Sequence, residues 1–90
     1  MDGDRLDEGL RAIAHADRRL FIRLCLDGEK AAGELAARSS LSLASVSEHL
    51  KVLRKCGLLR LNKQGRFWRY RTDREVLSAL SKEVARLDSE

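Results

Sequence analysis

The sequence predicts a mainly α-helical domain with a small β-hairpin, made of about five helices and two strands. Three observations support this fold class. Apolar residues recur at spacings of three and four along most of the chain. Between residues 58 and 71 the pattern changes to alternation, and the 90 residues contain no proline that would interrupt a helix. We expect residues 1–90 to form one compact domain.

The composition is that of a small folded domain. Hydrophobic residues make up 43% of the chain and charged residues 36%, so there is enough apolar material for a packed core. A domain of 90 residues buries only a modest share of its surface, and association with a second copy would stabilise it. The first ten residues, MDGDRLDEGL, lack the features of a signal peptide, and no apolar run is long enough to span a membrane. We therefore expect a cytoplasmic protein.

Three helices are expected in the first forty residues. The first covers roughly residues 6–14 and the second roughly residues 16–27, with His15 as the cap of the second. The segment KAAGELAARSS predicts a third, short helix whose core contacts are Leu35 and Ala36. A brief turn, SLS, follows it.

A fourth helix is expected between Ser42 and Gly57. The Ser42 hydroxyl can accept a hydrogen bond from an unpaired backbone N–H of the first turn, and Gly57 suits the position after the last turn. The apolar residues recur at three, four and three positions and predict one buried stripe: Leu43, Val46, Leu50 and Leu53. The residues expected to face outward are Ala44, Ser45, Glu48, Lys51 and Lys55, with Ser47 and His49 on the flanks.

A hairpin follows this helix. The segments LLRLN and RFWRYR, on either side of KQG, predict two antiparallel strands joined by a tight turn at Gly65. Alternation places Trp68 and Tyr70 on one face of the hairpin, where we expect them to pack on the core. Arg69 and Arg71 then point toward solvent or a phosphate.

The C-terminal segment, TDREVLSALSKEVARLDSE, predicts a fifth helix capped by Thr72 or Asp73. Its apolar residues share one face: Val76, Leu77, Leu80, Val84 and Leu87. No other predicted element remains to cover that whole face.

Basic residues are concentrated in the second half of the chain. The net charge is only +4, with a pI of about 9.5. Residues 1–30 carry six basic and seven acidic side chains, whereas residues 49–72 carry eight Lys or Arg and no Asp or Glu. Such a local positive field attracts a polyanion.

Two short helices joined by a tight turn and followed directly by a basic hairpin form a winged helix-turn-helix. A helix fits the major groove of DNA, which is about 12 Å wide, and outward residues near its N-terminal end can reach base edges. The hairpin, or wing, can lie along the neighbouring backbone, where Lys63 and Arg66 would neutralise phosphates. The sequence therefore predicts binding to double-stranded DNA.

These residues resemble the ArsR/SmtB family of bacterial winged-helix transcriptional repressors. The block VSEHLKVLRKCGLL is similar to the family pattern V-S-x-H-L-x-x-L-x-x-x-G-L at every defining position. The resemblance covers nearly the whole chain. The segments that are similar to the family's second-helix entry, helix-turn-helix and wing are AIAHADRRLFIRLCLDGE, GELAARSSLSLASVSEHLKVLRKCGLL and KQGRFWRYR.

The resemblance implies a homodimeric repressor that pairs through its first and last helices. It also implies a palindromic operator, with the two recognition helices in successive major grooves about 34 Å apart. The residues expected at the dimer interface are Leu6, Leu10, Ile13, Leu77, Leu80, Val84 and Leu87. The residues expected to contact DNA are Ser42, Ala44, Ser45, Ser47, Glu48, His49, Lys51, Lys63, Gln64 and Arg66.

The recognition helix departs from the family at three positions. Polar or basic residues that the family commonly carries are replaced here by Leu43, Ala44 and Glu48. Ala44 can contact a thymine methyl group and Glu48 can accept from cytosine N4, while Leu43 fits the core equally well. The remaining candidates for base reading are Ser45, Ser47 and His49.

The family's known metal sites are missing from the sequence. The cysteine positions of its thiolate motif fall on Ala31 and Gly33, and the C-terminal segment after residue 71 contains no His. The metals of these sites need thiolate or imidazole donors. We therefore predict no metal and no other cofactor.

The sequence leaves two alternatives to DNA-dependent repression open. A winged helix can serve as a protein-interaction module, and Cys25 and Cys56 could form a redox switch, although buried thiols are more often structural. The sequence does not identify a small-molecule effector. An enzyme is not expected, because the sequence shows no nucleophile with a base, no paired carboxylates in an apolar setting and no phosphate-binding loop.

Overall fold

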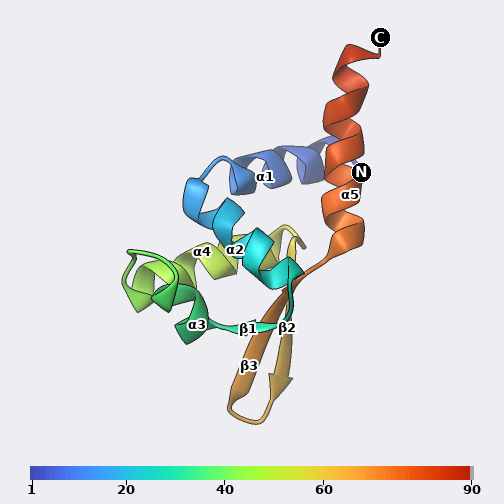
Figure 1. Ribbon diagram of the computed structural model, residues 1–90. Helices are drawn as coiled ribbons and strands as arrows, with labels where there is room; N and C mark the ends of the chain where they lie inside the picture. Colours follow the sequence, from blue (N-terminus) through green and yellow to red (C-terminus); the bar gives the residue numbers. More distant parts are fainter. Residues whose placement is uncertain (90) are drawn as a thin grey trace.

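A computed structural model describes residues 1–89 and confirms the predicted fold class. Five α-helices surround a small antiparallel sheet, and a short 3-10 helix follows the last of them (Figure 1). The helices are α1 (Gly3–Ile13), α2 (Ala16–Leu26), α3 (Ala32–Ala37), α4 (Leu43–Lys55), α5 (Arg74–Ala85) and η1 (Arg86–Asp88). The strands are β1 (Lys30–Ala31), β2 (Leu59–Gln64) and β3 (Phe67–Thr72).

Local capping fixes the ends of the helices. As predicted, the Ser42 hydroxyl accepts from the backbone N–H of Ser45 at 3.2 Å. Of the two predicted caps of α5, Thr72 and Asp73, the carboxylate of Asp73 is the cap. Gly57 lies just after α4 at a φ of +83°, a conformation that favours glycine. The predicted cap at His15 is wrong, because its side chain makes no capping hydrogen bond. The first helix begins earlier than expected, at Gly3, because the Asp2 side chain caps it.

The wing forms as predicted, and a third strand joins it. Six residue pairs join β2 to β3, and the two-residue turn between the strands holds Gly65 at a φ of +62°. The sequence prediction missed β1, which pairs with β3 from the other side to give the order β1-β3-β2. A strand of two residues has no alternation to detect, and its partner lies forty residues away in the chain, at Tyr70.

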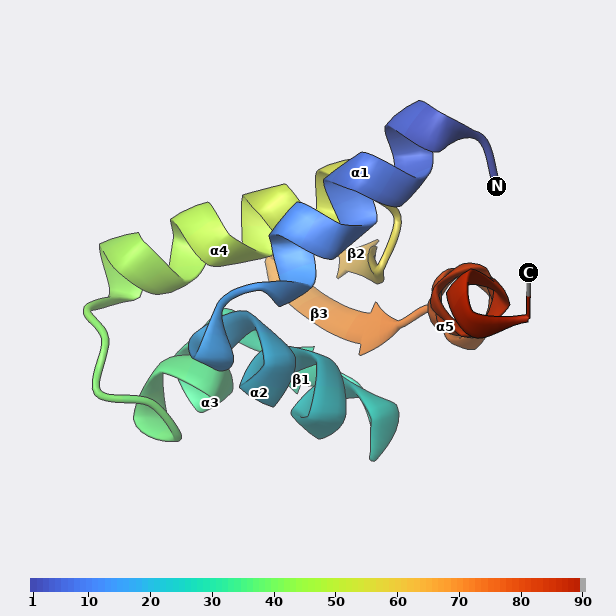
Figure 2. The ribbon, with the colours of Figure 1, turned by 90° about the horizontal axis from the view of Figure 1, so that it is seen from above.

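The core lies between two helical layers. Seen from above, α1 and α4 lie on one side of β3, and α2 and α3 lie on the other (Figure 2). The large side chains that are almost fully buried are Phe21, Leu35, Val46, Leu50, Leu53, Leu58 and Leu59. They come from α2, α3, α4 and β2, with Leu58 just before β2, so the same core holds the helix-turn-helix and the base of the wing in place.

Two residues predicted to be buried are exposed. Leu43, expected in the buried stripe of α4, is 57% exposed, because it is the first residue of the helix and lies beyond the reach of α3. Trp68, expected in the core, is 45% exposed, because it pairs with Lys63 near the tip of the wing. Tyr70, two residues nearer the body, is buried as predicted.

The apolar face of α5 is covered along only part of its length. Leu80 is 2% exposed and packs against α1 at Gly9, where an added Cβ would lie 3.2 Å from a Leu80 methyl group. Val84 and Leu87, one and two turns further on, are 44% and 75% exposed. The prediction that no element covers this whole face is therefore wrong for its first half, which packs on α1.

No helix within residues 1–89 is long and apolar enough to cross a membrane.

Candidate nucleic-acid interface

Helix α3 and the turn that follows it orient α4. Backbone N–H groups of Arg38 and Ser39 donate to the carbonyls of Leu35 and Ala36 at 3.1 and 3.2 Å. The Ser39 hydroxyl also donates to the carbonyl of Ala36 and accepts from the N–H of Leu41. These bonds close α3 and fix the direction in which the chain enters α4.

The outer face of the first half of α4 is polar and free of core contacts. The predicted contact residues that lie exposed on it are Ser42, Ala44, Ser45, Ser47, Glu48 and Lys51. Leu43 adds an exposed apolar side chain at the start of this face. Lys51 lies 3.4 Å from Glu48, so the only acid of the helix has a basic partner within the same turn. Short side chains at the N-terminal end allow the helix to approach a groove closely.

His49 is the predicted contact residue that the structure does not place on this outer face. Its Nδ1 accepts a hydrogen bond from Arg18 Nε of α2 at 2.9 Å, and its ring lies near those of His15 and Phe21. Burial, followed by the Arg18 charge, lowers the pKa of His49 below 6.5, which keeps the ring neutral at neutral pH. His49 therefore ties α4 to α2, and base contact by its imidazole stays an untested expectation.

The tip of the wing carries both charge and exposed aromatic surface. Lys63, Gln64 and Arg66 are exposed, as a DNA-contacting wing requires, and the Lys63 ammonium lies 4.3 Å above the Trp68 ring. Phe67 is 72% exposed. Phe67 and Trp68 were missed as site residues, although two adjacent aromatic residues beside a hairpin turn must point to opposite faces, at most one of which can reach the core.

We name these exposed residues the α4–wing surface: Ser42, Ala44, Ser45, Ser47, Glu48, Lys51, Lys63, Gln64 and Arg66. The positive charge around it is smaller than the sequence suggested. Of the eight Lys and Arg between residues 49 and 72, three form ion pairs with acids outside that segment: Lys51 with Glu48, Arg60 with Asp73 and Arg69 with Glu34. Five of the eight have no ion pair within residues 1–89, including the wing-tip Lys63 and Arg66.

Neither cysteine has the environment of a reactive thiol. Cys25 is 3% exposed, and burial raises its pKa to about 11. Burial also raises the pKa of Cys56, whose thiol donates to the carbonyl of Leu53. Protonated, buried thiols react slowly with oxidants. In the part of the chain that the structure describes, no three His, Cys, Asp or Glu side chains are grouped to hold a metal ion.

A second exposed region lies on α1 and α5, at the end of the molecule away from the wing tip (Figure 1). We name it the α1–α5 face. It comprises Leu10, Val84 and Leu87, which are exposed, and Leu6, Ile13 and Leu77, which are partly buried. Leu80, also predicted at the interface, is already buried within the chain. The uncovered area is therefore smaller than the sequence indicated.

A helix-turn-helix with an exposed polar second helix and a basic hairpin beside it defines the winged helix-turn-helix class. The sequence model of the bacterial regulatory protein, arsR family, matches residues 17–60, from the start of α2 into β2. An ArsR-like transcriptional regulator from Rhodococcus sp. RHA1 has the same fold, with a TM-score of 0.88, 26% identity and coverage of 96% of this chain and 79% of that chain. The chain belongs to the ArsR family.

Two regulators of known name are similar in sequence. The transcriptional repressor SdpR of Bacillus subtilis is 30% identical over 67 residues, which are 74% of each chain. The transcriptional regulator CmtR of Mycobacterium tuberculosis is 42% identical over 60 residues, which are 67% of this chain and 51% of CmtR. The match to CmtR thus spans about half the length of that relative.

Proposed function

We propose that this protein is a homodimeric, sequence-specific transcriptional repressor of the ArsR type that acts in the cytoplasm without a metal. The proposal rests on the α4–wing surface. This surface combines a polar helix face with a basic hairpin tip, and the same core supports both elements. The helix would enter the major groove and the wing would neutralise phosphates beside it. The repressor role follows the similarity to SdpR, and it would be tested by transcription from the bound promoter.

The α1–α5 face supports the dimer. Leu10 on α1, Val84 on α5 and Leu87 on η1 expose apolar side chains, α1 packs on α5, and a second copy placed about a two-fold axis would cover them. Two recognition helices related by that axis would read a palindromic operator whose half-sites lie about 34 Å apart. Sedimentation equilibrium tests the dimer, and footprinting tests the spacing.

The wing is tested through the salt dependence of DNA binding. Replacing Lys63 and Arg66 together by Ala is expected to weaken binding to every DNA sequence, because phosphate contacts are independent of the bases. The slope of log affinity against log salt should fall by up to about two units. Replacing Arg5 and Arg23 together by Ala removes the same charge from exposed positions on α1 and α2 and should leave the slope unchanged. An equal fall in both variants would remove the wing from the interface.

One observation favours a protein-interaction module as a second candidate. Exposed Phe67 and Trp68 form an aromatic tip that a protein partner could cover. The salt dependence of DNA affinity separates the two candidates. If the wing binds a protein, binding to DNA should be non-specific and should disappear at physiological salt. The thiol-redox alternative receives less support, because Cys25 is buried and its thiol stays protonated.

A further inference from the structure

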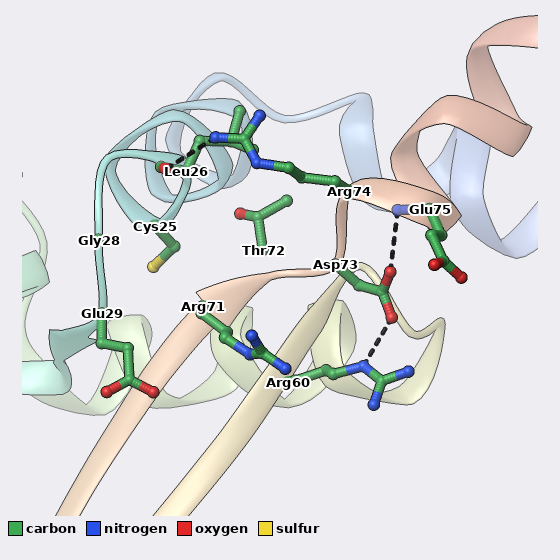
Figure 3. A pocket seen from close by; sticks show the side chains of 10 residues that line it. All are labelled: Cys25, Leu26, Gly28, Glu29, Arg60, Arg71, Thr72, Asp73, Arg74 and Glu75. Carbon is green, nitrogen blue, oxygen red and sulfur yellow. Dashed lines mark hydrogen bonds and ion pairs between the residues drawn. The ribbon is translucent and has the colours of Figure 1, made fainter.

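A pocket of about 510 Å³ lies outside the α4–wing surface, where the end of α2, the strands β2 and β3 and the start of α5 meet (Figure 3). Three arginines and three carboxylates line it: Arg60, Arg71 and Arg74, and Glu29, Asp73 and Glu75. The side chains of Cys25 and Leu26 add an apolar part to its wall. Its volume lies in the range of about 300–1,000 Å³ that is typical of small-molecule sites.

Two of these arginines face each other across the hairpin. Arg60 and Arg71 are direct partners in the β2–β3 register, and both side chains line the pocket (Figure 3). Like charges in this position destabilise a sheet unless an anion lies between or beside them. Asp73 compensates Arg60, whose Nε donates to its carboxylate at 2.6 Å. Within residues 1–89, Arg71 has no acid at ion-pair distance, although Glu29 and Glu75 also line the pocket, so its guanidinium is available to a ligand.

We propose that this pocket binds a small organic anion with a carboxylate or phosphate group, and that this anion is the effector of the regulator. The proposal rests on the proposed function. A guanidinium group offers paired N–H donors in the geometry that carboxylate and phosphate oxygens accept. Arg71 supplies a guanidinium that forms no ion pair within residues 1–89, Arg60 a second donor group, and Leu26 an apolar contact for the organic part.

The same arginines connect the pocket to α5. Asp73, which holds Arg60, also caps α5 through the N–H groups of Glu75 and Val76, and Arg74 donates to the carbonyl of Leu26 at 3.1 Å. An anion that draws Arg60 toward itself competes with Asp73 for that guanidinium. The start of α5 would then shift relative to α2 and β2. Because α5 carries part of the proposed dimer face, the spacing of the two recognition helices would change with it.

Binding is tested on the DNA-free protein by NMR titration with inorganic phosphate and, separately, with succinate, each balanced by chloride to constant ionic strength. Arg71→Gln is expected to weaken saturable binding by about tenfold or more, since it removes charge-assisted hydrogen bonds. Arg69→Gln is the matched control, because Arg69 lies on the same strand and face but pairs with Glu34 and does not line the pocket. Equal affinities for the two variants, or no saturable shift with either anion, overturn the proposal.

A DNA-binding experiment distinguishes a free anion from a DNA phosphate as the ligand of Arg71. With chloride alone, Arg71→Gln should bind DNA with the affinity and salt slope of the unaltered protein. Phosphate at matched ionic strength should then lower the DNA affinity of the unaltered protein at least about fivefold and leave that of Arg71→Gln unchanged. A salt slope reduced by about one in Arg71→Gln would place a DNA phosphate on Arg71 and overturn the effector. Failure of the unaltered protein to bind DNA would instead reject the proposed function, and the titration would still decide the pocket.

Discussion

The α4–wing surface and the α1–α5 face expose opposite kinds of side chain. The first consists of polar residues on α4 and of the basic wing-tip residues Lys63 and Arg66, which form no ion pair within residues 1–89. The second consists of Leu and Val side chains on two helices that already pack on each other through Leu80. One core supports both surfaces, so they differ in their exposed side chains and not in the packing beneath them. Basic and polar side chains suit contact with a polyanion, whereas apolar side chains suit contact with another apolar surface.

The largest expected effect separates the buried part of α5 from its exposed part. Leu80→Ala should lower the free energy of unfolding by about 2–5 kcal/mol, because it leaves a cavity between α1 and α5. Chemical denaturation followed by circular dichroism measures this loss. A loss below about 1 kcal/mol would mean that α5 does not pack on α1 in solution.

Leu87→Ala removes the same atoms from the exposed end of this region. Because Leu87 is 75% exposed, the circular dichroism spectrum should not change. Self-association should weaken by about tenfold or more, since burial of a Leu side chain contributes about 1.5–3 kcal/mol. Sedimentation equilibrium of the two variants makes the comparison. Unchanged association in Leu87→Ala would move the dimer interface away from the α1–α5 face.

A smaller effect is expected at the two helix caps, one in each region. Ser42→Ala should cost about 1 kcal/mol of stability at any pH, because a hydroxyl does not titrate. Asp73→Ala should cost about 1–2 kcal/mol at pH 7, because it removes a cap and the partner of Arg60. The hydrogen bond from Arg60 lowers the pKa of Asp73 below its ordinary 3.8.

The direction of this pKa shift fixes the pH dependence. A folded-state pKa below the unfolded value means that Asp73 contributes its stability above about pH 4 and loses it as the pH falls through the folded-state pKa. The cost of Asp73→Ala should therefore shrink in acid, while the cost of Ser42→Ala should stay level. Denaturation curves between pH 3 and pH 7 test this, and parallel behaviour of the two variants would contradict the Arg60–Asp73 pair.

The smallest effect on stability is expected at the wing tip. Phe67 is 72% exposed, so Phe67→Ala should change the free energy of unfolding by less than about 0.5 kcal/mol. If the tip packs on DNA, affinity should fall about fivefold, with no change in salt slope because no charge is lost. Fluorescence anisotropy over a salt series measures both quantities. A reduced slope would show that the whole wing had moved.

The sequence predicted the features that depend on local chemistry. The caps at Ser42 and Asp73, the glycine after α4 and the turn at Gly65 follow from single residues and their near neighbours. It failed where the outcome depends on distant parts of the chain. Leu43 and Trp68 have apolar spacing, yet the core ends before it reaches them.

The candidate site shows the same division between local and distant contacts. Its residues were named from their position in the motif, and all of them except His49 are exposed where expected. The inward turn of His49 depends on Arg18, thirty-one residues earlier in the chain. The charge balance depends on pairs such as Arg69 with Glu34, which alternation and composition cannot show. Contacts of this kind are visible only once the elements are packed together.

The proposed function requires that α4 and the wing of two protomers read DNA as a symmetric pair. The most direct measurement is selection of genomic DNA fragments by the purified protein at physiological salt, followed by hydroxyl-radical footprinting of the recovered fragments. We expect one palindromic site with two protected half-sites about one helical turn apart. Recovery of fragments without a shared sequence, lost as salt rises to the physiological range, would contradict it.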